Sequence, residues 1–235
     1  MKNRGLSAIF PYQSMRIFFN TPVWSLRNVP HSISSEVGVM MSMYLSMASF
    51  ALAASISPGP VNLVSLSAGA RHGLRVAMGH VAGATLGFTL LLVLIGLGLH
   101  QLLVLLPWLT VAIQWAGVAF LLYLAWRLAV DNGALHSAEG GAVASFAGGA
   151  LMQWLNPKAW LAAIAGTGAF AADGDAWRVW QFAAIYCVVC YLSLACWAIA
   201  GTCLQPYLQA PQRVRVFNRM LAGLLMASAG YLVLA

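Results

Sequence analysis

The chain has 235 residues, of which 61% are hydrophobic and only 7% carry a charge. Soluble domains carry about 25% charged residues, so this composition excludes an ordinary water-facing surface. The formal net charge of +7 would suggest a nucleic-acid partner in a soluble protein, but here the basic residues stand mostly in the N-terminal segment and between apolar runs. Membrane orientation and anionic lipid explain them there. We therefore expect an all-α polytopic membrane protein, embedded in the lipid bilayer, that binds no nucleic acid.

The N-terminal segment 1–40 differs from the rest of the chain. It holds the basic residues Lys2, Arg4, Arg16 and Arg27, and the prolines Pro11, Pro22 and Pro30. These prolines break any long helix, and the apolar stretches between them are too short for the core of a signal peptide. We predict that residues 1–40 are a disordered or misassigned tail and that residues 41–235 form the transmembrane domain.

Six apolar segments follow the tail. Each has about 20 or more mostly apolar residues, the length that a membrane-spanning helix requires. The predicted spans are about 42–66, 76–100, 108–127, 144–171, 177–201 and 216–235. Tryptophans stand at their ends, as amphipathic aromatic residues do at membrane interfaces. The sequence thus predicts a multi-pass protein.

Arginines gather in alternate loops, and this sets the expected orientation. The loops after the first, third and fifth spans carry or adjoin Arg71, Arg75, Arg127, Arg213, Arg215 and Arg219, whereas the loops after the second and fourth offer only Arg178. The arginine-rich loops are therefore expected in the cytoplasm, with both termini outside. The basic residues of the tail favour the opposite arrangement, with the tail in the cytoplasm. If the proline-broken first segment re-enters the membrane instead of crossing it, five crossings remain and the tail lies on that side. Both topologies stay open here.

Prolines interrupt two spans at corresponding places in the two halves of the chain. The PGP motif at 58–60 breaks the first span and Pro157 breaks the fourth, because proline lacks the backbone N–H and clashes with the preceding turn. Each half, about 41–128 and 143–235, holds three spans, and an odd number gives the halves opposite orientations. We predict two inverted three-helix repeats, an arrangement in which broken helices mark a binding site near the bilayer midplane.

Polar residues accompany both breaks. Lys158 lies near the centre of the fourth span, where a lysine costs about 2.5–3.5 kcal/mol on insertion scales. Such a lysine either faces a functional cavity or snorkels to the interface from a shorter span. Asn62, one turn after the first break, either closes freed carbonyls, contacts a substrate or joins helices. The candidate substrate pathway comprises Pro58, Gly59, Pro60, Asn62, Asn156, Pro157 and Lys158.

The second span carries a glycine ladder with a histidine inside it. Gly79, Gly83 and Gly87 are spaced so that another helix can approach closely. Packing within the chain is favoured over a homodimer seam, although a homodimer remains a candidate. His80 is a candidate proton-linked residue, because histidine titrates near neutrality; its alternative role is packing at the interface.

The sequence contains no recognisable catalytic or metal-binding constellation. All five acidic residues lie outside the spans, and no metalloprotease motif or phosphate-binding loop is present. We therefore expect no enzyme activity, no cofactor and no metal. The pair Cys187 and Cys190 matches a redox spacing, and a membrane thiol–disulfide electron carrier is the alternative function. Helix packing is favoured over this alternative, because cysteine is among the most commonly buried small apolar residues and these cysteines stand in the fifth span, away from the two breaks.

The motifs SPGPVNLVSLSAGARHGLRVAMGHVAGATLG (57–87) and NPKAW (156–160) resemble the lysine-exporter/homoserine-threonine-resistance family of bacterial amino-acid exporters. The resemblance covers about residues 41–235. The segments GATLGFTLLLVLIGLGL and LACWAIAG are most similar to the cysteine/O-acetylserine efflux branch. Many members of the family carry an acidic residue just after the glycines of the second span, where this chain has Ala84 and Thr85.

The resemblance implies a six-helix protein of the bacterial inner membrane that exports amino acids or their derivatives against proton entry. The residues themselves indicate a gradient-driven secondary transporter with its pathway between the two halves. Lys158 is then the expected partner of the substrate carboxylate, and the carbonyls freed near Pro58 and Pro157 are the expected partners of its ammonium group.

Overall fold

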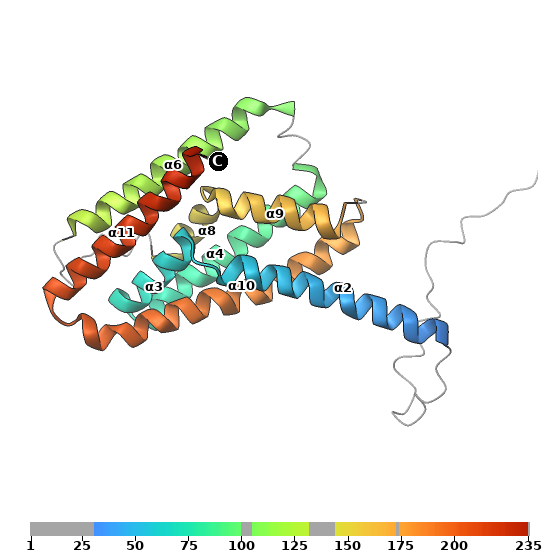
Figure 1. The fold of residues 1–235 in the computed structure, drawn as a ribbon, viewed down its shortest axis with the longest axis horizontal. Coiled ribbons are helices and arrows are strands. Elements are labelled where there is room, and N and C mark those ends of the chain that lie inside the picture. Colours follow the sequence, from blue (N-terminus) through green and yellow to red (C-terminus); the bar gives the residue numbers. More distant parts are fainter. Residues whose placement is uncertain (1–30, 100–104, 132–143, 173, 235) are drawn as a thin grey trace, which may run out of the picture. The chain divides into compact units, whose positions relative to one another are not determined.

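The computed structural model describes residues 31–99, 105–131, 144–172 and 174–234, and every element in this part of the chain is a helix (Figure 1). The chain divides into two compact units, Met1–Met43 and Tyr44–Ala235, and the second contains all of the features described below. The elements are α2 (His31–Ile56), α3 (Pro60–His72), α4 (Leu74–Leu94), the π-helix η2 (Ile95–Leu99), α6 (Pro107–Val130), α8 (Phe146–Trp154), α9 (Pro157–Phe170), α10 (Ala176–Leu204), the 3₁₀-helix η3 (Gln205–Leu208) and α11 (Pro211–Leu234).

The first break separates α2 from α3. Gly59 is extended, with φ −164° and ψ 173°, and Pro60 opens α3. Proline suits the first helical position, because its fixed φ is helical and the N–H that it lacks would have no partner there. Gly73, with φ 79°, then joins α3 to α4. This is a left-handed conformation that glycine adopts at little cost.

The second break separates α8 from α9 and is built differently. Ser145 caps α8 by accepting a hydrogen bond from the Gly148 N–H at 3.0 Å. Asn156 is extended, with φ −102° and ψ 103°, because the ring of Pro157 excludes the helical conformation from the residue before it. The Asn156 side chain then caps α9 by accepting from the Lys158 N–H at 3.2 Å.

Four helical segments of the described chain are long and apolar enough to cross a membrane: Glu36–Ile56, Leu74–Leu99, Val111–Val130 and Ala176–Leu208. The protein is therefore a multi-pass helical membrane protein. The helices α8 and α9 are each too short to span alone, with 9 and 14 residues. α11 begins with three arginines in its first nine residues (PQRVRVFNR), which lowers its hydropathy. The six crossings and the inverted repeat stay predictions.

The helix α2 begins earlier than the sequence indicated. It starts at His31, directly after Pro30, so residues 31–40 are helical although we expected them in a disordered tail. The helix also crosses the boundary at Met43 between the two compact units. The remainder of the predicted tail, 1–30, lies outside the described residues.

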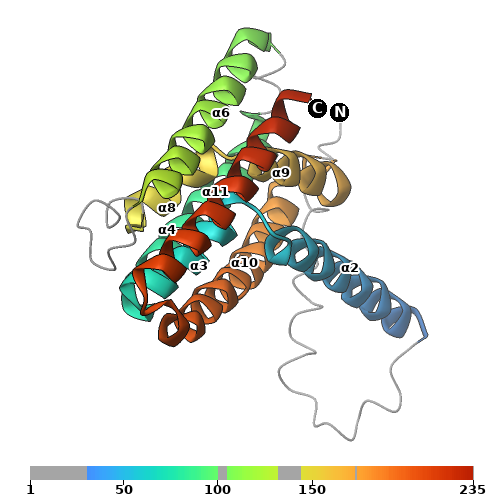
Figure 2. The same ribbon diagram turned by 60° about the vertical axis from the view of Figure 1, so that its left-hand side comes forward.

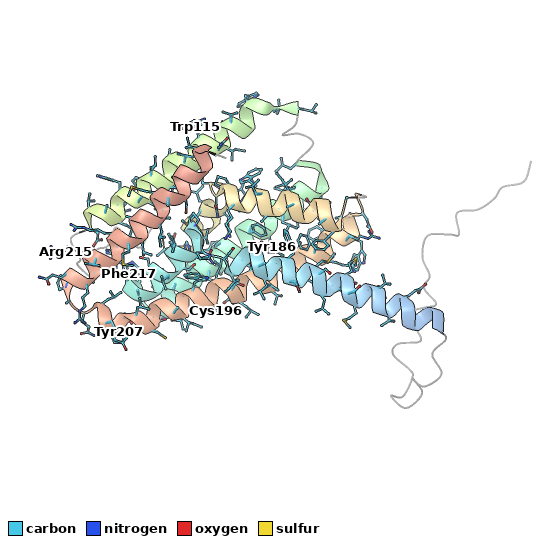
Figure 3. The ribbon with its side chains drawn as sticks, in the orientation of Figure 1. Trp115, Tyr186, Cys196, Tyr207, Arg215 and Phe217 are labelled. Atoms are coloured by element: carbon cyan, nitrogen blue, oxygen red, sulfur yellow. The ribbon has the colours of Figure 1, made fainter. Side chains whose placement is uncertain are left out.

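Packing within the Tyr44–Ala235 unit pairs helices from the two halves of the chain. The helix α4 packs along α8 and α10, α10 packs along α3, and α6 packs along α11 (Figures 1 and 2). An aromatic cluster fills the centre, where the rings of Phe88 and Tyr186 stack with centroids 4.3 Å apart and Phe182 meets Tyr186 edge-on at 5.7 Å. Tyr186 lies in the interior of the unit (Figure 3). This cluster forms one wall of the candidate site.

Candidate functional site

The two helix breaks meet at Lys158. Its ammonium nitrogen Nζ donates hydrogen bonds to the carbonyl and the hydroxyl oxygen of Ser57, at 2.7 and 2.9 Å, and lies 3.5 Å from the Pro58 carbonyl. A Cβ on Gly59 would lie 3.2 Å from both Cδ and Nζ of Lys158, so the absence of a side chain at Gly59 leaves room for the lysine. Residues from opposite halves of the sequence therefore form one site.

Side chains satisfy the carbonyls at the end of α2 that Pro58 and the extended Gly59 leave without a helical N–H. The Ser57 hydroxyl donates to the Ala54 carbonyl at 3.1 Å, and the Asn62 amide donates to the Ser55 carbonyl at 2.8 Å. A membrane interior offers no water to replace such bonds. Of the roles that we considered for Asn62, the structure shows the closing of a freed carbonyl.

Trp197 of α10 completes this capping, and the sequence analysis missed it. Its indole N–H donates to the Ile56 carbonyl at 3.1 Å. No clear signal for it stood in the sequence, because Trp197 lies near the end of the predicted span 177–201, where an interfacial tryptophan is usual. With Trp197, the end of α2 is tied to both α9 and α10.

The second break satisfies its own backbone. The Gln153 carbonyl, which Pro157 frees, accepts from the Asn156 N–H at 3.2 Å, and the Trp154 carbonyl accepts from the Trp160 indole at 2.9 Å. Gln153 and Asn156 are both only 5% exposed. The polar groups of this break therefore lie in the interior of the unit, next to Lys158.

A small central cavity lies between the breaks and the aromatic cluster. Its volume is about 30 Å³, enough for about two water molecules. Polar side chains contribute much of its wall: Ser55, Asn62, Gln153, Asn156, Lys158, Tyr186 and Cys190. Gln153 and Ser55 were not among our candidates, although each is a polar residue inside an apolar run.

A larger cleft lies on the other side of Lys158. Its volume is about 410 Å³, within the range of about 300–1,000 Å³ that is usual for ligand pockets. Both breaks and α11 line it, through Pro58, Gly59, Pro60, Leu63, Asn156, Lys158, Leu161, Leu224, Ala227 and Ser228. Lys158 and Asn156 line the cleft and the central cavity alike. Of the seven candidate pathway residues, five line the cleft, Asn62 lines the central cavity, and Pro157 lines neither.

The charge of Lys158 is the main electrostatic feature of the site. Within the described residues, its hydrogen-bond partners are neutral oxygens of Ser57 and Pro58. A cation in a membrane interior is expensive unless an anion or water accompanies it. The arrangement therefore favours a ligand that brings a carboxylate to Lys158.

His80 and the glycine ladder lie apart from this site. His80 is fully buried in α4, its carbonyl lies against Gly149 of α8, and it lines neither the cleft nor the central cavity. Gly83 and Gly87 face α8 of the same chain, while Gly79 faces open space. These contacts show that Gly83 and Gly87 pack within the chain. A proton-linked His80 and a homodimer both stay predictions.

The cysteines are free thiols, and one lies where we did not expect it. Cys190 is buried and lines the central cavity, whereas Cys187 on the same helix lines neither space. The sequence analysis placed both cysteines in helix packing, away from the breaks. A thiol relay needs a second thiol at the breaks, and Cys190 is the one cysteine among the residues that line the central cavity.

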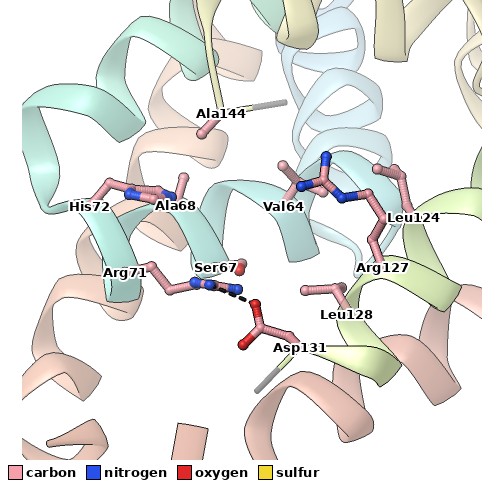
Figure 4. Close-up of a pocket in the computed structure, with 10 residues that line it drawn as sticks. All are labelled: Val64, Ser67, Ala68, Arg71, His72, Leu124, Arg127, Leu128, Asp131 and Ala144. Carbon is pink, nitrogen blue, oxygen red and sulfur yellow. Dashed lines mark hydrogen bonds and ion pairs between the residues drawn. The ribbon is translucent and has the colours of Figure 1, made fainter. Parts of the chain in front are cut away.

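A third cavity, of about 80 Å³, lies where α3 and α6 end (Figure 4). A guanidinium nitrogen of Arg71 contacts the Asp131 carboxylate at 2.7 Å there, and the two side chains are only 6% and 13% exposed. Ser67 and Arg127 also line this cavity. The sequence analysis used Arg71 and Arg127 only to orient the chain, and it overlooked Asp131 because this residue stands just outside a span.

Comparison with known proteins matches this chain to a translocator family and to efflux proteins. The model of the LysE type translocator family matches residues 52–235. A cysteine/O-acetylserine efflux protein of Klebsiella pneumoniae subsp. pneumoniae is 29% identical over 182 residues, which cover 77% of this chain and 91% of that protein. The protein of that name from Escherichia coli (strain K12) is 28% identical over 182 residues, covering 77% and 92%. The one from Salmonella choleraesuis (strain SC-B67) is 29% identical over 154 residues, covering 65% and 78%. No solved structure matches the chain significantly.

Proposed function

The chain belongs to the LysE type translocator family, and from this we propose that it is a secondary transporter exporting a small amino acid or amino-acid derivative across the bacterial inner membrane. The efflux proteins that it resembles are named for cysteine and O-acetylserine, which makes small neutral amino acids the first substrates to test. The observation that carries the proposal is the partly buried ammonium of Lys158, held by neutral oxygens at the wall of a 410 Å³ cleft.

A zwitterion fits this site by inserting between Lys158 and the first break. Its carboxylate binds the Lys158 ammonium and also lies near the N-terminus of α9, where the helix dipole favours an anion. Its ammonium donates hydrogen bonds to the Ser57 and Pro58 carbonyls, which Lys158 then no longer contacts. The substrate thus exchanges partners with Lys158 and the two carbonyls, so binding leaves neither charged group of the substrate, nor Lys158, without a partner.

The energy for export has two candidate sources, downhill flow of the substrate and coupled proton entry. We propose proton coupling, and His80 is the residue that we assign to it, because it is a titratable residue of α4 that is fully buried. The acidic residue that many relatives carry is replaced here by Ala84 and Thr85. Substrate-driven acidification of the vesicle lumen or the medium would distinguish the two sources.

The test of this function is export by a variant with neutral Lys158. Lys158→Met keeps most of the volume, removes the charge, and is expected to reach wild-type abundance in the membrane while losing export. Arg178→Met is the matched control, because Arg178 lies at the start of α10 with a side chain 45% exposed. It is expected to export normally. Wild-type export by Lys158→Met at equal abundance would contradict the assignment.

A further inference from the structure

One buried amide at the central cavity has no hydrogen-bond partner among the described residues. It belongs to Gln153 of α8, which lines this cavity and is only 5% exposed. The backbone carbonyl of the same residue accepts from the Asn156 N–H, but the side chain makes no hydrogen bond within the described part of the chain. A buried amide without a partner costs free energy, so a ligand that supplies the partner is favoured there.

This amide lies beside the place that we propose for the zwitterion. Lys158 and Asn156 line both the central cavity and the 410 Å³ cleft, so these two residues stand between the two spaces. A zwitterion that inserts between Lys158 and the Ser57 carbonyl lies at the same boundary. Its side chain can therefore leave the cleft and point into the central cavity, where Gln153 lies.

The central cavity is small, and part of its wall is fixed. Its volume of about 30 Å³ corresponds to a side chain of about two or three non-hydrogen atoms. Phe88 and Tyr186 line it, their rings stack 4.3 Å apart, and Phe182 packs edge-on against Tyr186. All three aromatic residues are buried. Because close-packed rings yield little space, the cavity excludes long side chains.

From this arrangement we propose that the central cavity is the pocket for the side chain of the substrate, and that Gln153 selects a short side chain ending in a hydroxyl or a thiol. The inference rests on the proposed transport function and adds to it the residue that recognises the side chain. An amide both donates and accepts hydrogen bonds, through Nε2 and Oε1, so it satisfies a hydroxyl in either orientation. A site that hydrogen-bonds a hydroxyl discriminates against the analogue that lacks it.

Serine and alanine are the matched pair of substrates that tests this inference, because they differ only in the hydroxyl. In proteoliposomes the wild-type protein is expected to reach half-maximal transport at about a fivefold lower concentration of serine than of alanine, which is the effect of one neutral hydrogen bond. Gln153→Met keeps the length of the side chain and removes the amide, so it should abolish this preference by weakening the binding of serine. Gln209→Met is the control, because Gln209 is exposed between η3 and α11. It should keep the preference.

A second variant tests the pocket by its size. Ala162 of α9 also lines the central cavity, and Ala162→Leu adds an isopropyl group there. Glycine has no side chain to place in the cavity, so it serves as the reference substrate. Ala162→Leu is expected to raise the half-saturating concentration of serine about tenfold more than that of glycine. This arm decides the inference if Gln153→Met fails to fold and loses transport of alanine as well.

The possible failures of this inference and of the proposed function are distinguishable. The inference alone is overturned if the wild-type protein transports serine and alanine equally well, or if Gln153→Met transports both and still prefers serine. It is also overturned if Ala162→Leu weakens serine and glycine alike. Absence of serine, alanine and glycine transport by the wild-type protein at normal abundance would instead contradict the proposed function, and the inference with it.

Discussion

Lys158 lies between two helix ends of opposite polarity. It is the second residue of α9, where the helix dipole disfavours a cation, but its ammonium reaches the carbonyl end of α2, where the dipole favours one. Each such interaction is typically about 0.3–1 kcal/mol. The side chain therefore connects the two breaks electrostatically as well as by hydrogen bonds.

Asn62 allows a test of the capping at the first break. Asn62→Leu leaves the Ser55 carbonyl without its donor, and an unsatisfied buried acceptor costs about 1–3 kcal/mol. We expect a lower melting temperature of the purified protein in detergent. Ser65→Ala is the control on the same helix, because the Ser65 hydroxyl donates to the Val61 carbonyl, which is already within α3. Equal melting temperatures of the two variants would show that Asn62 does not support the fold.

At the scale of the element, both broken helices were predicted from their prolines. The PGP motif and Pro157 impose a break wherever they stand in a helix, so α2, α3, α8 and α9 follow from local chemistry. That the two breaks lie next to each other in space was predicted only from the expected inverted repeat. The roles of Trp197 and Gln153 could not be assigned in advance. Which side chain caps a carbonyl, and which one lines a cavity, depends on how the helices pack.

The glycines of α4 differ in what surrounds them, and this gives a prediction for helix packing. A Cβ on Gly83 would overlap the Phe146 carbonyl, whereas one on Gly79 would meet nothing within 4 Å. Gly83→Val is expected to force α4 and α8 apart, at a cost of about 1–3 kcal/mol or more. Thermal unfolding in detergent should show this loss for Gly83→Val and little change for Gly79→Val. If Gly79→Val is the more damaging variant, Gly79 packs against another molecule and the homodimer gains support.

At the scale of the molecule, composition alone indicated a helical membrane protein, and the family match agrees. The packing partners of individual glycines could not be predicted. A Cβ on Gly69 would overlap the Ala198 carbonyl, whereas one on Gly166 would meet the ring of Phe182, and the sequence does not distinguish a backbone neighbour from a side-chain neighbour. A sequence encodes every state that a transporter visits, and a structure shows one of them.

The division at Met43 leads to a prediction about the N-terminus. The compact unit Tyr44–Ala235 contains both breaks, both cavities beside Lys158 and the ion pair. A chain that begins at Met40 is therefore expected to insert and to export at the wild-type rate, although it lacks the first residues of α2. Export and membrane abundance are measured together. Loss of export at normal abundance would show that the segment before Met40 contributes to transport.

The central claim is that Lys158 binds the carboxylate of the substrate where the two breaks meet. Competition in proteoliposomes tests it most directly, using the amino acid that the purified protein transports and its carboxamide, which keeps the ammonium but lacks the charged carboxylate. A hydrogen bond to a charged group contributes about 1.5–3 kcal/mol, so the amide should compete at least about tenfold more weakly than the acid. Equal competition by the acid and the amide in the wild-type protein would contradict the claim.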